Sequence, residues 1–344
     1  MMAMSGGVDS STTAALLCES GYDVTGVTLK LYARPGQAEN PDIAIARGIA
    51  KQLGIPHHLL DLQTEFAEHV IKRFIGDYRN GKTPNPCVYC NRHIKFGALL
   101  NFAESLGCDK LATGHYATVD YDPASKRYLL KKAADKHKDQ SYVLYSLNQR
   151  QLSKVLFPMG SKIKTAVREL AKEKGLPNHQ KPESQDICFV KGMSYSEFIK
   201  DYSGDTAIPG DFVDNEGNKL GTHEGIINYT IGQRKGLGIA FGEPKYVVAK
   251  LAEKNKVVIG EERDLYSNKL TAEAVNFIPF DTLTAPLKTT AKVRYNQEPA
   301  PATIHPLEGN KVHVEFTAPQ RAITPGQHVV FYDGNIVVGG GMIL

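Results

Sequence analysis

The sequence lacks any hydrophobic stretch that could cross a bilayer, and it has few cysteines. No run of eighteen apolar residues occurs in its 344 residues, so a membrane-spanning helix is not expected. No basic segment precedes an apolar one at the start, which argues against a secretory signal. Five unevenly spaced cysteines are too few for a disulfide framework in a chain this long, which favours a reducing, cytoplasmic location.

Neither sign of charge is in large excess, with 41 Lys and Arg against 37 Asp and Glu. The formal net charge of +4 does not by itself indicate nucleic-acid binding. A hydrophobic content of 42% and a charged content of 23% are typical of a globular protein. The length favours two or three domains.

The glycine-rich segment near the N-terminus, Met4-Ser5-Gly6-Gly7-Val8-Asp9-Ser10-Ser11, lacks the lysine of the common nucleotide-binding loop. Its two glycines allow close approach to an anion, and the apolar residues 14–17 predict a helix whose first N–H groups would bind phosphate. Without a lysine, Asp9 becomes a candidate Mg²⁺ ligand. The alternative is a glycine turn capped by Ser10 or Ser11 at a helix start.

Strands alternate with helices in the first half of the chain, which predicts a parallel sheet with helices on both faces. Strands are expected at residues 24–31, 57–62 and 111–113, and helices from a capping Asp42 to Leu53 and at 94–106, 148–156 and 165–175. Only Met1 to Met4 precede the phosphate loop, so either the first strand is short or the chain begins late. From Gly210 onward, short alternating runs separated by turn residues predict small all-β domains and a C-terminal barrel.

A second segment combines two prolines with two cysteines, Thr83-Pro84-Asn85-Pro86-Cys87-Val88-Tyr89-Cys90-Asn91. The prolines are expected to exclude regular structure until about Ile94. The C-x-x-C pair has three interpretations, namely a redox pair, half of a zinc site or part of an iron–sulfur site; two buried structural cysteines are the simpler alternative. Cys188 becomes a candidate for thiol chemistry if it lies near Cys90. Cys18 and Cys108 are interpreted as structural.

Basic residues are concentrated in two places, which suits either phosphate contacts or a solvated surface. Tyr295 beside Arg294 is a candidate for stacking on an unpaired base. The two basic segments are Lys126, Arg127, Lys131, Lys132, Lys136 and Lys138, and Arg234-Lys235.

Several motifs occur in one order from end to end, and together they resemble those of the bacterial tRNA-specific 2-thiouridylase family, in the ATP-pyrophosphatase superfamily. That superfamily splits ATP between its α- and β-phosphates and leaves AMP on a substrate. The motifs are the S-G-G-x-D-S loop, N-P-C-x-x-C-N followed by Ile94-Lys95-Phe96, Ala112-Thr113-Gly114-His115-Tyr116, Lys138-Asp139-Gln140-Ser141-Tyr142, Ile187-Cys188-Phe189, Gly232-Gln233-Arg234-Lys235-Gly236-Leu237-Gly238 and Thr324-Pro325-Gly326-Gln327.

The resemblance implies an α/β fold with three domains. These would be a parallel-sheet ATP-pyrophosphatase domain of the adenine-nucleotide α-hydrolase type at 1–193, a small β-rich central domain at 194–264 and a C-terminal β-barrel at 265–344. It also implies roles for individual residues. ATP would be bound by Ala3, Met4, Ser5, Gly6, Gly7, Val8, Asp9, Ser10, Leu29 and Gly114; the target base would face Asn85, Pro86 and Cys87; tRNA would be touched by His115, Lys138, Asp139, Gln140, Arg294, Tyr295 and Gln327.

The activity implied by the resemblance is ATP-dependent 2-thiolation of the wobble uridine in tRNAs of the lysine, glutamate and glutamine type. Cys90 corresponds to the catalytic nucleophile and Cys188 to the cysteine that carries persulfide sulfur, with a Cys90–Cys188 disulfide left at the end. ATP and Mg²⁺ would be required. A cysteine desulfurase or a relay protein would donate the sulfur, and no membrane partner is expected.

Cys87 departs from part of the family, because some members carry an aspartate there with an acid/base role. A thiol does not inherit that role, since the reference pKa is about 8.5 for cysteine and about 3.9 for aspartate. The alternative is a 4Fe–4S cluster on Cys87, Cys90 and Cys188 with one open iron. Two other functions also remain: an adenylating ligase for a small metabolite, which leaves the cysteines unexplained, and a non-catalytic RNA-binding protein, which leaves the phosphate loop unexplained.

Overall fold

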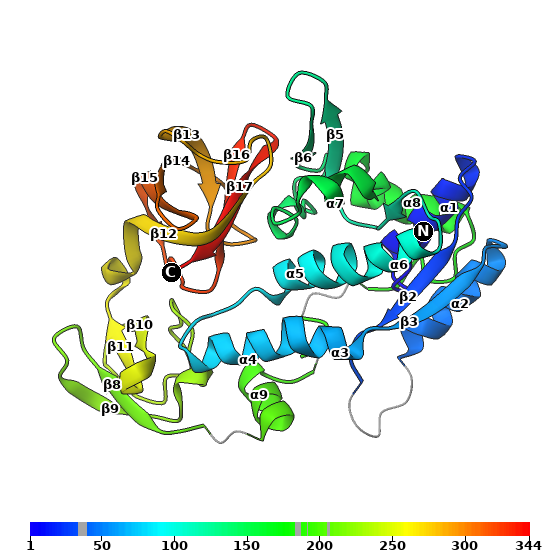
Figure 1. Ribbon diagram of the computed structural model, residues 1–344. Coiled ribbons are helices and arrows are strands. Elements are labelled where there is room, and N and C mark those ends of the chain that lie inside the picture. The colour runs from blue at the N-terminus through cyan, green and yellow to red at the C-terminus, as the bar shows by residue number, and fades with distance from the viewer. Residues whose placement is uncertain (34–39, 183–186, 191, 205–206) are drawn as a thin grey trace.

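The computed structural model describes residues 1–33, 40–182, 187–190, 192–204 and 207–344 (Figure 1). The polar turn expected before Cys188, at residues 183–186, lies outside the described residues. Within the described ranges, no helix is both long enough and apolar enough to span a bilayer.

The N-terminal part contains a parallel five-stranded sheet in the order β3-β2-β1-β4-β7, which confirms the expected α/β architecture. Its strands are β1 (Met2–Ala3), β2 (Gly26–Lys30), β3 (His57–Asp61), β4 (Leu111–Ala112) and β7 (Val155–Leu156). Leu156 was expected to end a helix, but α7 (Gln149–Lys154) stops before it and Leu156 pairs with Ala112 in the sheet.

Helices cover both faces of this sheet because side chains alternate along each strand. Met2 and Met4 pack in one core with α1 (Val8–Glu19), α2 (Pro41–Gln52) and α8 (Lys164–Glu173). On the other face, Met1, Val27 and Leu111 share a core with Phe96, Leu99 and Leu100 of a long helix.

The start of α2 differs from the prediction. Asn40, rather than Asp42, is its capping residue, because the Asn40 side chain accepts a hydrogen bond of 3.0 Å from the Asp42 N–H. Pro41 takes the first helical position, where its missing N–H has no intrahelical partner to lose. Asp42 therefore lies in the first turn.

The C-x-x-C segment is helical, so the expectation that the prolines exclude regular structure before Ile94 is wrong. One helix runs through α5 (Pro86–Tyr89), the π-helical η2 (Cys90–Ala98) and α6 (Leu99–Ser105). The Asn85 side chain caps it by accepting from the Cys87 N–H at 3.2 Å, and Pro86 again occupies the first position. Both cysteines thus lie in the first turns of a helix.

A second helical stretch, α3 (Gln63–Phe66), η1 (Ala67–Ile71, π-helical) and α4 (Lys72–Arg79), packs with α9 (Tyr195–Ser203) around a group of aromatic rings. Phe189 is central to this group, with its ring 5.6 Å from Phe66 and 5.3 Å from Phe74. Because Phe189 follows Cys188 directly, this core fixes the position of Cys188.

The described chain also has 3-10 turns η3 (Ser141–Val143), η4 (Pro158–Ser161), η5 (Ile226–Asn228), η6 (Ala252–Lys254) and η7 (Glu262–Leu265).

The later part of the chain is β-rich, as predicted. A four-stranded sheet in the order β10-β11-β8-β9 is followed by a six-stranded barrel, β12-β15-β14-β13-β16-β17, which closes because β12 also pairs with β17. The sheet contains β8 (Gly210–Val213), β9 (Lys219–His223), β10 (Tyr246–Leu251) and β11 (Lys256–Gly260). The barrel contains β12 (Tyr266–Phe277), β13 (Leu287–Lys292), β14 (Ala300–Leu307), β15 (Lys311–Arg321), β16 (His328–Asp333) and β17 (Ile336–Ile343).

The barrel is attached to the N-terminal part in two places. The hairpin of β5 (Thr118–Asp122) and β6 (Arg127–Lys131) joins the barrel edge, where Lys131 pairs with Ile336. At the start of β16, the His328 carbonyl accepts from the Tyr142 hydroxyl at 2.7 Å, and its ring Nδ1 lies 2.8 Å from the Tyr145 hydroxyl. In Figure 1 the helix beginning at α5 starts beside this barrel.

Candidate functional site

The phosphate loop lies between the end of β1 and the start of α1, as predicted. Gly6 has a φ of +71°, and a Cβ there would lie 2.5 Å from the Asp42 carbonyl oxygen, so only glycine fits. Gly7 is the N-cap of α1 and brings no side chain to cover the helix end. The Ser10 hydroxyl instead braces the loop, accepting from the Ser5 N–H at 3.2 Å and donating to the Gly7 carbonyl at 3.0 Å. The helix end is therefore arranged for an anion.

Gly114 completes one wall of this loop from the end of β4. A Cβ on Gly114 would lie 2.9 Å from the Ser10 backbone nitrogen and 3.0 Å from the Asp9 carbonyl carbon. The structure thus brings together Gly114 and the predicted segment from Ala3 to Ser10. Leu29, on the neighbouring strand β2, packs as a partly buried residue between two cores.

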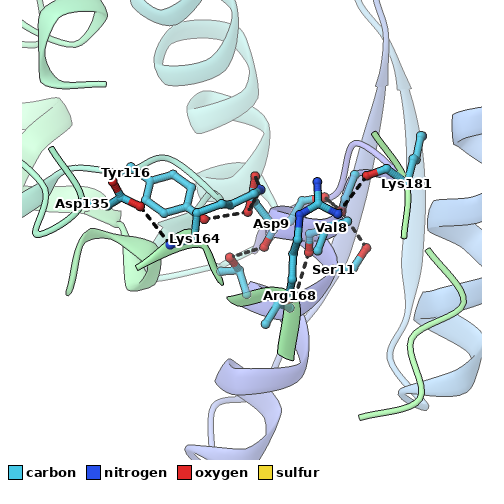
Figure 2. Close-up of polar contacts among 12 residues, drawn as sticks. Val8, Asp9, Ser11, Tyr116, Asp135, Lys164, Arg168 and Lys181 are labelled. Carbon is cyan, nitrogen blue, oxygen red and sulfur yellow. Dashed lines mark hydrogen bonds and ion pairs between the residues drawn. The ribbon is translucent and has the colours of Figure 1, made fainter. Parts of the chain in front are cut away.

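Two lysines distant in sequence reach the phosphate loop, and the sequence analysis missed both (Figure 2). Lys164, at the start of α8, places its Nζ 2.6 and 2.7 Å from the two carboxylate oxygens of Asp9. Lys181 donates to the Gly6 carbonyl at 3.2 Å and pairs with Asp42. Lys164 opens an amphipathic helix, which is an ordinary place for a surface lysine, so no local pattern signalled a contact 155 residues away.

The three cysteines Cys87, Cys90 and Cys188 lie close enough together for their charged forms to interact, which the sequence left as a hypothesis. Cys90 is partly buried, whereas Cys87 and Cys188 keep exposed surface, and all three are free thiols. The other two cysteines are partly buried and lie apart: Cys18 packs against the core that includes α1, and Cys108 against the core that includes the long helix.

One lysine acts electrostatically on all three thiols. Burial raises the pKa of Cys90 to about 12, while the positive charge of Lys95 lowers it. Burial raises the pKa of Cys87 as well, and Lys95 again opposes the shift. The pKa of Cys188 is raised by burial and by the neighbouring Cys87, and lowered by Lys95. Because Cys87 and Cys188 keep exposed surface, contact with solvent reduces the upward shift of their pKa values. Cys90 is therefore the thiol most strongly held in its protonated form.

Lys95 reaches these thiols because of the helix type. It follows Cys90 by five residues within the π-helical segment η2, whose wider turn brings residues five apart to the same side. Its Nζ also lies 3.4 Å from Nε2 of His115. Sequence analysis named Lys95 as part of a motif but gave it no role.

His115 connects the thiols with the phosphate loop. It is buried, and burial followed by the charge of Lys95 lowers its pKa well below the usual value, so the ring is neutral. Its Nδ1 lies 2.6 Å from the Thr113 hydroxyl. Lys95 can only donate to Nε2, so the pairing favours the tautomer in which Nδ1–H donates to Thr113.

The segment before α5 is held by the barrel. The Thr83 N–H donates to the Pro325 carbonyl at 2.8 Å, and the Gln327 side chain donates to the Thr83 carbonyl at 2.8 Å. Gly326 has a φ of +88°, and a Cβ there would lie 3.0 Å from the Thr83 nitrogen. The residues predicted to face the base, Asn85 to Cys87, follow this anchored segment directly.

Several of the residues predicted to touch tRNA also have structural partners in the protein. Gln140 exchanges hydrogen bonds with the backbone of Tyr116, and Asp139 accepts from the Ser141 N–H and hydroxyl. The Arg294 Nη2 donates to the Ala322 carbonyl and the Thr324 hydroxyl, both at 2.9 Å. The Lys138 N–H donates to the Asp135 carbonyl at 3.1 Å, and Tyr295 is partly buried and meets the ring of Tyr142 edge-on at 6.0 Å.

Known families match this chain along almost its entire length. A tRNA methyl transferase HUP domain matches residues 1–192, a tRNA methyl transferase PRC-barrel domain residues 196–261 and an aminomethyltransferase beta-barrel domain residues 267–343. Among solved structures, the U34-tRNA thiolase NcsA from Methanococcus maripaludis has a TM-score of 0.35 and 21% identity, over 60% of this chain and 63% of that one.

Two full-length relatives are much closer. The chain is 50% identical to the tRNA-specific 2-thiouridylase MnmA of Acetivibrio thermocellus, over 100% of this chain and 98% of that protein. It is 49% identical to the tRNA-specific 2-thiouridylase MnmA of Clostridioides difficile, over 100% of this chain and 97% of that protein. With a phosphate loop, a neighbouring group of thiols and a C-terminal barrel in the order that the motifs predicted, the chain belongs to the tRNA-specific 2-thiouridylase family.

Proposed function

We propose that this protein activates the C2 oxygen of the wobble uridine of tRNA with ATP and replaces that oxygen by sulfur. The observation that carries the proposal is that two adjacent residues touch both halves of the site. Gly114 lies against Ser10 of the phosphate loop, and His115 contacts Lys95, whose charge acts on the three thiols. The phosphate loop and the thiols therefore lie on either side of the same two residues, so that an adenylated base and a sulfur nucleophile could react within one site.

The first half of the reaction makes the oxygen a leaving group. The C2 oxygen attacks the α-phosphate of ATP, pyrophosphate leaves, and AMP stays on the base. Backbone N–H groups at the uncapped start of α1 suit this step, because they offer preorganised donors to the phosphates. The glycines at positions 6, 7 and 114 allow the nucleotide close to the backbone.

The second half brings sulfur. Cys188 would carry a persulfide, whose outer sulfur bonds to C2 as AMP departs. The Cys90 thiolate attacks Cys188 Sγ, breaks the sulfur–sulfur bond and leaves a Cys90–Cys188 disulfide, which a two-electron reductant must reopen. A cysteine desulfurase or a relay protein would supply the persulfide, and the free thiols suit a reducing, cytoplasmic location.

Lys95 is the residue we assign to thiol activation. Cys90 with a pKa near 12 is protonated at neutral pH, so its attack requires stabilisation of the thiolate. Among the causes acting on Cys87, Cys90 and Cys188, Lys95 is common to all three and favours the thiolate in each. A positive charge in this position would also favour an anionic sulfur arriving on Cys188.

The tRNA would lie across all three expected domains, 1–193, 194–264 and 265–344, which we retain as the working division. The hydrogen bond between Thr83 and the barrel supports a position beside the barrel for Asn85, Pro86 and Cys87, the residues that we expect to face the base. His115, Lys138, Asp139, Gln140, Arg294, Tyr295 and Gln327 stay our candidates for tRNA contact. The side chains of Gln140, Asp139 and Arg294 form hydrogen bonds within the protein, so these residues would also shape the surface on which tRNA would rest.

The residues as placed fit ATP better than a metal. Both oxygens of Asp9, the expected Mg²⁺ ligand, are paired with Lys164. In the described ranges, no three His, Cys, Asp or Glu side chains are grouped so as to hold a metal ion, and this includes Cys87, Cys90 and Cys188. We therefore derive no step through Mg²⁺ or through a 4Fe–4S cluster. Iron and sulfide analysis after anaerobic purification tests the cluster: stoichiometric iron that disappears in Cys87→Ala would support it.

The decisive experiment is mass spectrometry of tRNA nucleosides after incubation with ATP and a persulfide source. We expect 2-thiouridine with the unaltered protein and with the control Cys108→Ala, whose cysteine lies in the core, and none with Cys90→Ala or Cys188→Ala. Persistence of 2-thiouridine in Cys90→Ala would overturn the proposed nucleophile. Pyrophosphate release separates the alternatives, because a small-metabolite ligase needs no tRNA and an RNA-binding protein releases none.

A further inference from the structure

A partly buried ion pair joins α1 and α8 beside the phosphate loop, where the phosphates of a nucleotide would bind. Asp9 is the second residue of α1, directly after the phosphate loop, and Lys164 is the first residue of α8. The Lys164 side chain is 10% exposed and that of Asp9 30% exposed. Figure 2 shows the lysine extended toward the start of α1, with Tyr116 beside it.

Three further contacts hold this lysine in place. The Tyr116 hydroxyl donates to Asp9 Oδ1 at 2.8 Å. The Lys164 N–H donates to Asp135 Oδ2 at 2.9 Å, which fixes the first turn of α8. The Lys164 ammonium also lies 5.8 Å from the centre of the Tyr116 ring. The ammonium is therefore positioned from three separate segments of the chain.

Attachment of α8 to α1 does not by itself explain this ion pair. Val167 and Ala171 of α8 already pack with Ala14 and Leu17 of α1 in one apolar core. A second ion pair, Lys174 with Glu19, joins the same helices near their other ends. Ion pairs that are partly withdrawn from water contribute little net stability because desolvation opposes their attraction, so stability alone does not account for this one.

We propose that Lys164 is the phosphate-binding lysine of the nucleotide site, supplied from α8 instead of from the loop. The inference rests on the proposed use of ATP. When no nucleotide is bound, Asp9 holds the ammonium beside the loop; the phosphate oxygens of ATP or of the product pyrophosphate then share or replace Asp9 as its acceptors. Asp9, Tyr116 and Asp135 are positioning residues in this arrangement.

The proposal requires the charge of Lys164 to interact with phosphate, and not merely to neutralise Asp9. A Lys164→Gln variant alone does not separate these roles, because it leaves an unpaired carboxylate that repels phosphate. The double variant Asp9→Asn/Lys164→Gln removes both charges and isolates the contribution of the lysine itself. Lys164→Arg keeps the charge.

The test is the affinity of full-length protein for ATP and for inorganic pyrophosphate, measured by calorimetry without tRNA. We expect Lys164→Gln and the double variant to bind each ligand about 10- to 100-fold more weakly, as for loss of a hydrogen bond to a charged group, and Lys164→Arg to recover part of the affinity. Lys174→Gln, which breaks the other ion pair of the same helices, is the control and should bind as the unaltered protein does.

Two outcomes would overturn the inference. One is ATP affinity restored in the double variant, since Lys164 would then act only by neutralising Asp9. The other is unchanged affinity in Lys164→Gln. Thermal unfolding without ligand identifies a variant that does not fold, in which case Lys164→Arg and the double variant decide. If the unaltered protein binds no ATP, the proposed function fails, and not this inference alone.

Discussion

Lowering the pH should weaken the attachment of the barrel to the N-terminal part through a single histidine. His328 is buried at this contact, with its ring 5.6 Å from those of Tyr89 and Tyr145, and no hydrogen-bond partner is found for its Nε2 in the described structure. Burial, followed by the charge of Arg73, lowers its pKa from 6.5 to about 3. The folded protein therefore keeps this imidazole neutral.

The magnitude follows from the difference between folded and unfolded pKa values. Because the folded pKa lies below the unfolded one, the unfolded chain binds more protons between pH 6.5 and pH 3, and stability falls as the pH is lowered through that range. The contribution is fully present above pH 6.5. At about 1.4 kcal/mol per pKa unit, roughly 2 kcal/mol is lost between pH 7 and pH 5.

Urea unfolding at pH 7 and pH 5 measures this loss. The chain has 16 tyrosines and no tryptophan, so tyrosine emission follows the transition. His328→Asn keeps a polar group near the Tyr145 hydroxyl but does not titrate, so its stability should depend less on pH by about 2 kcal/mol over the same interval. Other buried histidines, such as His115, affect both proteins alike. An equal loss in the variant and in the unaltered protein would refute this reasoning.

Three further changes have defined outcomes. Lys95→Met should slow alkylation of Cys90 about tenfold for each unit by which its pKa rises, whereas Lys95→Arg should not; peptide mass spectrometry after iodoacetamide treatment measures this, and equal labelling would contradict the role of the lysine. Gln327→Ala removes the donor to the Thr83 carbonyl, a loss of about 1 kcal/mol, so thiolation should fall while ATP affinity stays unchanged; a parallel fall in ATP affinity would contradict a local effect. Gly114→Ala places a methyl group 2.9 Å from the Ser10 nitrogen, so the affinity for ATP should drop. Unchanged affinity in calorimetry would show that the loop can shift to accept the methyl group, which would contradict this prediction.

The sequence predicted the features that depend on local pattern. Apolar and β-branched runs predicted β2, β3 and β4 of the parallel sheet, although β7 lies where a helix was expected. Alternating runs after Gly210 predicted the barrel. Local rules failed at Pro86, where proline was interpreted as a helix breaker although an asparagine cap before it makes that position a favourable helix start. The same error hid the fact that Cys87 and Cys90 lie in the first turns of a helix.

Contacts distant in sequence were the other part that could not be predicted. The phosphate loop contains no lysine, but Lys164 reaches Asp9 across 155 positions, because the packing of α8 on α1 brings the two residues together. Lys95 stood in a quoted motif, yet its proximity to the thiols depends on the π-helical turn after Cys90. Neither the Lys164–Asp9 contact nor the position of Lys95 produces a local pattern in the sequence.

The hydrogen bond from Gln327 to Thr83 has a consequence for synthesis of the chain on the ribosome. The phosphate loop and the residues that contact it, Gly114, Lys164 and Lys181, all lie in the first half of the chain or just beyond it. The Thr83 carbonyl, by contrast, accepts from Gln327, which is 244 positions later. A partly translated chain can thus fold its phosphate loop while the segment that precedes Cys87 and Cys90 still lacks its contact with the barrel. Activity is therefore expected only after translation has passed Gln327, and not as soon as the N-terminal part has folded.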